Sequence, residues 1–228
     1  MTLCLICCFI SMTDLTPDSI EEFHPQKRSP AFRILVVLVA IGLVLLSIQT
    51  YFYFLHPEPV NIPTLSDVQN LLGSELQQPF TSHAPNDVRQ VIDETRDNIK
   101  QVANFVAAKS CDKADRVCQS KALYYFVRDE ITYVADDHFH DQLENPLTVL
   151  KTGGADCEDM AVLLIALQKA IGNQARLVFI PGHAYAQVSI PDYRGEQWIN
   201  LEGTCDTCQF GGLPTDVGLQ KKTYVDLN

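Results

Sequence analysis

The clearest pattern in this sequence is a long run without charged side chains, from Ile34 to Leu55. As a helix rising about 1.5 Å per residue, this run is long enough to cross the hydrocarbon core of a bilayer, which is roughly 30 Å thick. Aromatic residues occupy positions 51–54 at its far end, where membrane proteins often carry an interfacial belt. The pattern predicts one transmembrane helix over residues 34–55.

Basic residues flank this run on one side only. Lys27, Arg28 and Arg33 precede it, and the next basic residue along the chain is Arg89. Because positive charge is retained on the cytoplasmic side, residues 1–33 are expected to be a cytoplasmic tail, with the rest of the chain outside. The alternative is a cleaved signal peptide, whose apolar region is usually shorter, at roughly 7–15 residues, and is followed by a small-residue cleavage site. We expect an uncleaved signal-anchor that lies in the lipid bilayer.

Proline residues follow the predicted span. Pro57, Pro59 and Pro63 stiffen the backbone, so residues 56–84 are expected to form an extended stalk or linker. A short helix is predicted within this segment, from about Ser66 to Leu76.

From residue 85 onward the pattern is that of a globular domain, which we place at residues 85–228. Apolar positions at helical spacing predict one long helix from Asn86 to about Ala108 and another from about Ala114 to Glu130. A polar, acidic loop follows at Asp136–Glu144. Its run of aspartate and histidine residues lacks the spacing of a calcium loop, which favours a solvated loop over a metal site.

A third helix and three strands complete the domain. Gly153 and Gly154 provide a turn, and Asp156 with Asp159 three residues later resembles a capping box, so a helix should begin here and end at Gly172. Strand patterns follow at residues 175–180, 183–190 and 197–202, separated by turn residues. The predicted class is α+β, with helices first and then an antiparallel sheet against the third helix.

The net charge and the cysteines argue against some classes of partner and site. The net charge of −11 argues against nucleic acid as a partner, because that binding requires a basic face. Outside the cytoplasm thiols tend to pair, and local pairing would join Cys111 to Cys118 and Cys205 to Cys208, leaving Cys157 over. The rival interpretations are a four-cysteine zinc site, and redox chemistry by Cys205-x-x-Cys208, which lacks the strand–helix context of thioredoxin. We expect disulfides and no metal.

Cys157 has the position of a nucleophile. It lies in the first turn of the predicted third helix, where free N–H groups and the positive end of the helix dipole favour a thiolate and can hold an oxyanion. The adjacent carboxylates Asp156, Glu158 and Asp159 oppose negative charge, so the site needs a nearby cation, which a protonated histidine would supply. Taken alone, a cysteine on a helix is more often a small core residue.

His183 is the best-placed histidine, because it opens the second predicted strand. A hairpin loop at Pro191–Gly195 would place His183 opposite Gly203, and a loop one residue shorter would place it opposite Glu202. Glu202 is therefore the expected orienting carboxylate, with Asn200 on the same strand face as the fallback.

These residues resemble the motifs of a known family. Residues 154–161, Gly-Ala-Asp-Cys-Glu-Asp-Met-Ala, are similar to the turn and nucleophile helix of the transglutaminase-like superfamily. His-Ala-Tyr at 183–185 resembles its histidine strand motif, and residues 198–204, Trp-Ile-Asn-Leu-Glu-Gly-Thr, resemble its acidic motif. Residues 126–134 are similar to the segment ahead of the core. The similarity extends over roughly residues 121–204.

The resemblance implies a papain-like α+β fold with Cys157 as nucleophile, His183 as base and Glu202 as orienting acid. The sequence departs from the family where Glu202-Gly203 replaces aspartate-proline, and it has no match to the tryptophan that lines the oxyanion site of animal transglutaminases. We expect a thiol hydrolase of peptide or amide bonds that acts on cell-envelope proteins without a cofactor. The alternatives are acyl transfer to an amine, which uses the same residues, and a non-catalytic envelope-binding module.

Overall fold

A computed structural model describes residues 29–55, 58–77, 88–135, 143–191, 193 and 197–227. The chain divides into two compact units, residues 1–49 and residues 50–228. The predicted acidic loop lies mostly outside the described residues, as does Asn86.

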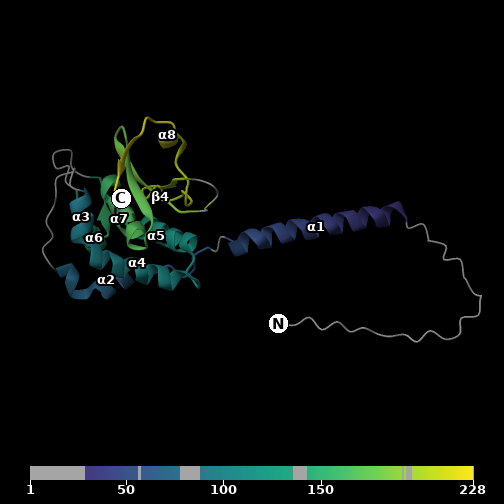
Figure 1. The fold of residues 1–228 in the computed structure, drawn as a ribbon, viewed down its shortest axis with the longest axis horizontal. Helices are drawn as coiled ribbons and strands as arrows, with labels where there is room; N and C mark the ends of the chain where they lie inside the picture. Colours follow the sequence, from purple (N-terminus) through teal and green to yellow (C-terminus); the bar gives the residue numbers. More distant parts are fainter. Residues whose placement is uncertain are drawn as a thin grey trace, which may run out of the picture. The chain divides into compact units, whose positions relative to one another are not determined.

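The first helix, α1, spans Pro30–Leu55 and is drawn in purple in Figure 1. It is long and apolar enough to cross a membrane, with a mean hydropathy of 2.8 over its most apolar window. This confirms an apolar helix at the predicted place, beginning four residues earlier than expected. A signal sequence near an N-terminus has the same properties, so the anchor and its orientation remain predictions.

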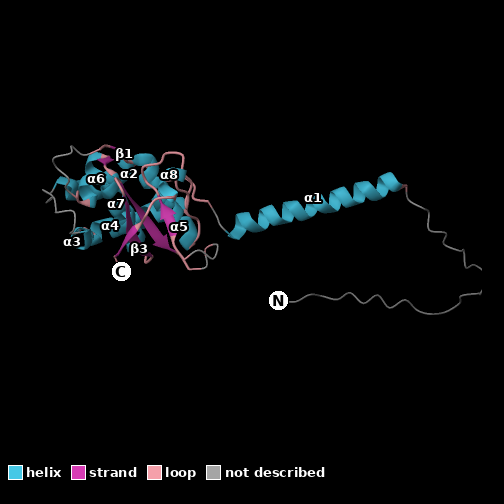
Figure 2. Ribbon diagram, turned by 90° about the horizontal axis from the view of Figure 1, so that it is seen from above, coloured by secondary structure: helices cyan, strands magenta, loops and turns pink. Residues whose placement is uncertain are grey.

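Most helices of the second unit precede its small sheet in the chain and lie beside it in space (Figure 2). The sheet has four antiparallel strands in the order β5-β4-β3-β6, and a separate parallel pair joins β1 to β2. The helices and the 3₁₀ helix η1 are α2 Leu65–Leu72, η1 Gly73–Gln77, α3 Val88–Glu94, α4 Arg96–Ser110, α5 Arg116–Glu130, α6 Pro146–Thr152, α7 Cys157–Ala170 and α8 Thr215–Gly218. The strands are β1 Thr132–Tyr133, β2 Gly154–Ala155, β3 Gln174–Ile180, β4 His183–Ser189, β5 Ile199–Leu201 and β6 Thr223–Asp226.

Helix α7 is the centre of the core. All its residues from Asp159 to Gln168 are buried, because β3 and β4 cover one side and α4 and α5 pack against the helix elsewhere. A helix that is apolar all round needs such complete burial. Fully burying one leucine or isoleucine contributes roughly 1.5–3 kcal/mol, so the apolar residues from Asp159 to Gln168 stabilise the fold strongly. The helix whose first residue is Cys157 is thus held rigidly, and the predicted α+β class is confirmed.

The prediction of an extended stalk at residues 56–84 is wrong for residues 58–77, because these residues pack onto the domain. Val68, Leu72 and Leu76 lie in the core. Polar contacts add to this packing: Leu65 N donates to Glu130 Oε2 at 2.7 Å. The apolar residues of α2 and η1 decide the place of this segment.

Three further features of the fold differ from the sequence prediction. The long helix expected to end near Ala108 is two helices, α3 and α4, broken at buried Thr95, whose hydroxyl donates to the Val91 carbonyl at 3.0 Å. Helix α6 was missed although Asn145 caps its start by accepting from Leu147 N at 2.9 Å. Strand β6 was also missed, because its four residues are exposed and carry no alternating pattern.

Candidate active site

Cys157 is held by two local devices at the start of α7. Gly153 ends α6 with a φ of 76°, and a Cβ there would lie 2.8 Å from Leu65 Cδ2, so glycine is required for both backbone and space. Asp156 then caps α7 by accepting from Asp159 N at 2.9 Å. The buried Asp159 carboxylate accepts from Glu144 N at 2.8 Å and so ties the preceding loop to the helix. These contacts fix Cys157 at the helix N-terminus, as the sequence predicted.

The outer cysteines pair as expected. Cys111 is bonded to Cys118 and Cys205 to Cys208, and Cys157 is the free cysteine within the described part of the chain. Sulfurs that are joined in disulfides are not available as thiolate ligands, so this structure contradicts the rival zinc site. Cys157 is half-buried.

His183 connects Cys157 to Glu202. Its Nε2 lies 2.8 Å from Glu202 Oε2, and the Cys157 side chain is near enough to be the largest cause of the raised pKa of His183. Because Nε2 faces Glu202, Nδ1 is the ring nitrogen left for the thiol. The structure thus brings all three predicted residues together in one chain of contacts.

The Glu202 carboxylate is almost completely buried, with 1% of its side chain exposed. Its other oxygen, Oε1, accepts from Thr204 N at 3.1 Å and from the Thr204 hydroxyl at 2.8 Å. Both carboxylate oxygens are therefore satisfied, which a buried charge requires. The role of Thr204 was missed, although it lies two residues after Glu202, a spacing at which local side chain–backbone bonds are common.

The strand register differs from both expected pairings. Gln187 pairs with Asn200 and Ala186 with Leu201, so continuing the ladder places Tyr185 opposite Glu202. His183 is two residues before Tyr185, and Glu202 therefore reaches it along the diagonal of the ladder. A diagonal contact is longer than a direct one, which explains why the extra methylene of glutamate fits here.

The imidazole of His183 is electrostatically perturbed. The interaction with the Cys157 side chain, followed by the hydrogen bond to Glu202, raises the pKa of His183 to about 10, while burial opposes the rise. The ring is therefore protonated at neutral pH in this geometry and can donate from both nitrogens. It is the cation that the acidic surroundings of Cys157 require.

Two neighbours of Glu202 in the chain make contacts of their own. Gly203 packs against α7, where an added Cβ would lie 3.3 Å from Leu164 Cδ1. Asn200, the fallback orienter, bonds elsewhere: its Oδ1 accepts from Gln187 Nε2 at 2.7 Å, and its amide nitrogen donates to the Gly211 carbonyl at 3.4 Å. Glu202 occupies the orienting position instead.

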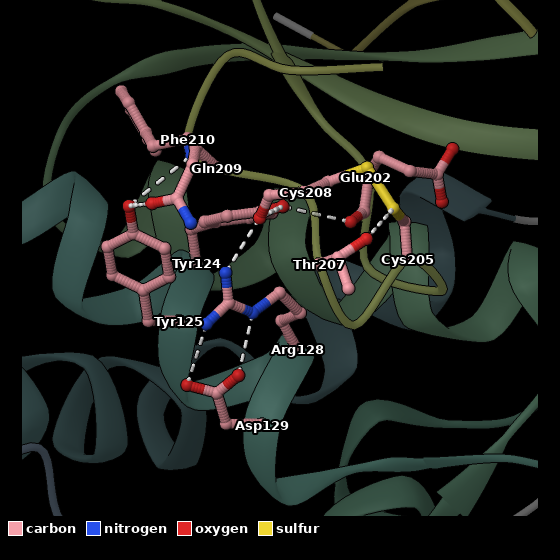
Figure 3. A network of polar contacts seen from close by, with 10 residues as sticks. All are labelled: Tyr124, Tyr125, Arg128, Asp129, Glu202, Cys205, Thr207, Cys208, Gln209 and Phe210. Atoms are coloured by element: carbon pink, nitrogen blue, oxygen red, sulfur yellow. Dashed lines mark hydrogen bonds and ion pairs between the residues drawn. A yellow bond between two sulfur atoms is a disulfide. The ribbon is translucent and has the colours of Figure 1, made fainter. Parts of the chain in front are cut away.

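Side chains of α5 contact the backbone of Glu202 and of the loop after it (Figure 3). The Tyr124 hydroxyl on α5 shares its single proton in a three-centre hydrogen bond with the backbone carbonyls of Glu202 and Cys208, each at 3.1 Å. Arg128, one turn further along α5, donates to the same Cys208 carbonyl at 2.6 Å. The sequence pattern placed Tyr124 only as an apolar helix position, and no local signal points to its hydroxyl.

Residues 101–203 match the family model of the transglutaminase-like superfamily. This segment is a transglutaminase-like domain. It contains Cys157, His183 and Glu202, and Thr204 follows directly after its last residue. None of the curated proteins matches the chain significantly.

Solved structures similar to the transglutaminase-like domain and its flanks include proteins from two bacteria. Legionella pneumophila LapG is 16% identical, with a TM-score of 0.42 over 74% of this chain and 87% of LapG. Its calcium-bound form is 17% identical, with a TM-score of 0.40 over 70% and 82% of the two chains. A protein of Parabacteroides distasonis ATCC 8503, described as a putative protease, is 10% identical with a TM-score of 0.39. The alignment covers 54% of this chain but only 26% of that protein.

Proposed function

We propose that this protein is a membrane-anchored thiol hydrolase whose domain lies outside the cytoplasm and cleaves amide or peptide bonds in cell-envelope proteins. One observation carries the proposal: His183 bridges the free Cys157 thiol and the buried Glu202 carboxylate. Nucleophile, base and orienting acid in contact are the parts that cysteine hydrolases of many folds share.

The reaction begins with the Cys157 thiolate attacking the substrate carbonyl carbon. The carbonyl oxygen takes the negative charge, which N–H groups in the first turn of α7 can stabilise. As the C–N bond breaks, His183 gives its proton to the leaving amine nitrogen and the acyl group remains on Cys157 as a thioester. His183, now neutral, takes a proton from water, whose oxygen attacks the thioester; collapse of this second intermediate releases the carboxylic acid and restores the Cys157 thiolate beside the protonated His183.

Glu202 supports these steps by holding the ring of His183 through Nε2. The carboxylate stabilises the imidazolium and leaves Nδ1 directed to the thiol, as the acid does in other catalytic triads. Thr204 satisfies the second carboxylate oxygen, so the acid remains fixed while the proton moves.

The proposed location has its own support. Helix α1 is apolar enough to span a bilayer, and basic residues precede it but do not follow it closely. The two disulfides of the domain are typical of an oxidising compartment. Together they favour an uncleaved anchor with the domain on the outer side, close to envelope proteins as substrates.

Alkylation of the full chain in detergent micelles, without reductant, tests the proposal. Iodoacetamide labelling followed by peptide mapping gives the rate at Cys157 from pH 6 to 9. We expect rapid labelling at Cys157 at neutral pH and a rate at least tenfold lower in His183→Ala, because the imidazolium is lost. Ser189→Ala, at the other end of β4, is the matched control and should label as the wild type.

Substrate assays then separate the reactions that the site supports. Peptide amides incubated with and without a fluorescent primary amine distinguish release of a carboxylic acid from incorporation of the amine. Acid release alone supports hydrolysis, whereas amine incorporation would identify an acyltransferase. If Cys157 in the folded wild type reacts no faster than in the unfolded chain, the thiol-enzyme proposal is wrong and a binding role is the better account.

A further inference from the structure

The loop that follows Glu202 is closed by a disulfide and fastened to α5. Cys205 and Cys208 are bonded across three positions of sequence, which makes the loop short and fixes the direction of the Cys208 carbonyl. Tyr124 and Arg128 both donate to that carbonyl (Figure 3). Residues four apart on a helix share a face, so α5 presents both donors to the loop together.

Arg128 is itself held in place. Its guanidinium lies 4.5 Å from the centroid of the Tyr125 ring and makes two bonds to the Asp129 carboxylate, at 2.6 and 3.1 Å. A cation fixed by stacking and by a two-point contact loses little freedom when it binds a third group. The Cys208 carbonyl therefore has a rigid partner, and the disulfide loop is anchored independently of Glu202.

Tyr124 connects this anchored loop to the triad. Its ring is fully buried and packs edge-on against Phe210 at 5.8 Å between centroids. Burial raises the pKa of its hydroxyl, so the group remains a proton donor across the working pH range. With one acceptor in the loop and the other on Glu202, the hydroxyl fixes the distance between the two backbones.

We propose that Tyr124 is a positioning residue of the active site: its hydroxyl clamps the Glu202 backbone to the Cys205–Cys208 loop and so sets the reach of the Glu202 carboxylate to His183. The proposal rests on the proposed thiol chemistry only for its effect on reaction rate. Its direct effect is on the His183–Glu202 contact, which can be measured without any reaction. Tyr124 does not touch the reacting atoms and acts through Glu202.

Tyr124→Phe removes the hydroxyl and keeps the buried ring. The first measurement is the pKa of His183. It is obtained by pH titration of the C2–H NMR signal in the histidine-labelled full chain in micelles. The signal of His183 is assigned by its loss in His183→Ala. We expect the pKa of His183 to fall by about 0.5–1 unit. This is the effect of losing one hydrogen bond if its whole free energy is lost from the His183–Glu202 contact. The second measurement is the Cys157 alkylation rate.

Tyr125→Phe is the matched control. Its hydroxyl comes from the same helix and contacts the same loop, donating to Gln209 Oε1 at 3.1 Å, but none of the contacts described above joins it to Glu202. A second variant, Cys205→Ser with Cys208→Ser, keeps Tyr124 and opens the loop that holds its other acceptor. We expect the His183 titration to be unchanged in Tyr125→Phe and lowered in the double variant.

The outcomes separate this inference from the proposed function. A lower melting temperature in Tyr124→Phe with an unchanged His183 titration would mean that the hydroxyl is merely structural, and the inference would be wrong. If Tyr124→Phe does not fold, an unchanged titration in the double variant has the same meaning. A lower pKa of His183 in Tyr124→Phe, together with an unreactive Cys157 in the wild type, would support the clamp and contradict the proposed thiol enzyme.

Discussion

Replacing Glu202 by glutamine should switch the hydrogen-bond polarity at His183. Thr204 donates to Oε1 from its backbone N–H, which has no acceptor capacity, so the amide oxygen of glutamine must take that position. The amide NH₂ then replaces Oε2 and points at His183 Nε2. Two donors cannot share a hydrogen bond, so the variant favours the neutral ring with Nε2 unprotonated.

The size of the effect follows from the bond that is lost. A hydrogen bond between charged groups contributes roughly 1.5–3 kcal/mol, and one pKa unit corresponds to about 1.4 kcal/mol. Losing the 2.8 Å contact to the buried carboxylate should therefore lower the pKa of His183 by about 1–2 units from its value of about 10. The imidazolium would then be lost at roughly pH 8–9.

Two alkylating reagents make this shift visible. Iodoacetate is negatively charged and is attracted by the imidazolium, so its rate at Cys157 should fall as His183 loses its proton, whereas neutral iodoacetamide should show no such fall. We expect the alkaline limb of the iodoacetate profile to move down by about 1–2 pH units in Glu202→Gln. Glu75→Gln removes the same charge from an exposed position and should leave the limb unchanged. An unmoved limb in Glu202→Gln would refute the assignment of Glu202 as the group that holds the imidazolium.

Three further predictions concern stability, each measured by urea unfolding of the full chain in micelles. Gly203→Ala should cost about 1 kcal/mol, because the new Cβ crowds Leu164; an unchanged midpoint would mean that the neighbours yield freely. Leu164→Ala should cost about 3 kcal/mol by leaving a cavity in a fully buried site, and a loss below 1 kcal/mol would contradict the packing of α7. Cys111→Ala with Cys118→Ala should cost about 2–3 kcal/mol, since the bridge closes a loop over seven positions; a smaller loss would indicate a denatured state that is already compact.

The site was predictable where local chemistry determines it. The N-cap at Asp156 and the glycine turn before it are short-range signals, and they place Cys157 at the start of α7 without tertiary information. Strand alternation placed His183 and Glu202 within reach of each other. Their diagonal contact was not predictable, because the register depends on the loop between β4 and β5, where one residue more or less changes every pairing.

The features that were missed depend on distant parts of the chain. Strand β6 is recognisable only from its pairing with β3, more than forty positions earlier in the chain. The segment at residues 58–77 had a usable signal, since Val68, Leu72 and Leu76 recur at helical spacing, but the prolines before them favoured a stalk. The clamp made by Tyr124 could not be foreseen, because both of its acceptors are backbone atoms.

Strand β6 also limits how the molecule can be cut. It pairs with β3 and covers what would otherwise be the outer edge of the sheet, although it lies beyond the segment that matches the family. A fragment ending at residue 203 would leave the backbone groups of β3 unpaired, and an open strand edge is a template for aggregation. The smallest soluble fragment should therefore continue through Leu227, which is itself buried against the core. A purification tag that disturbs the pairing of β6 with β3 would lower the solubility it is meant to improve.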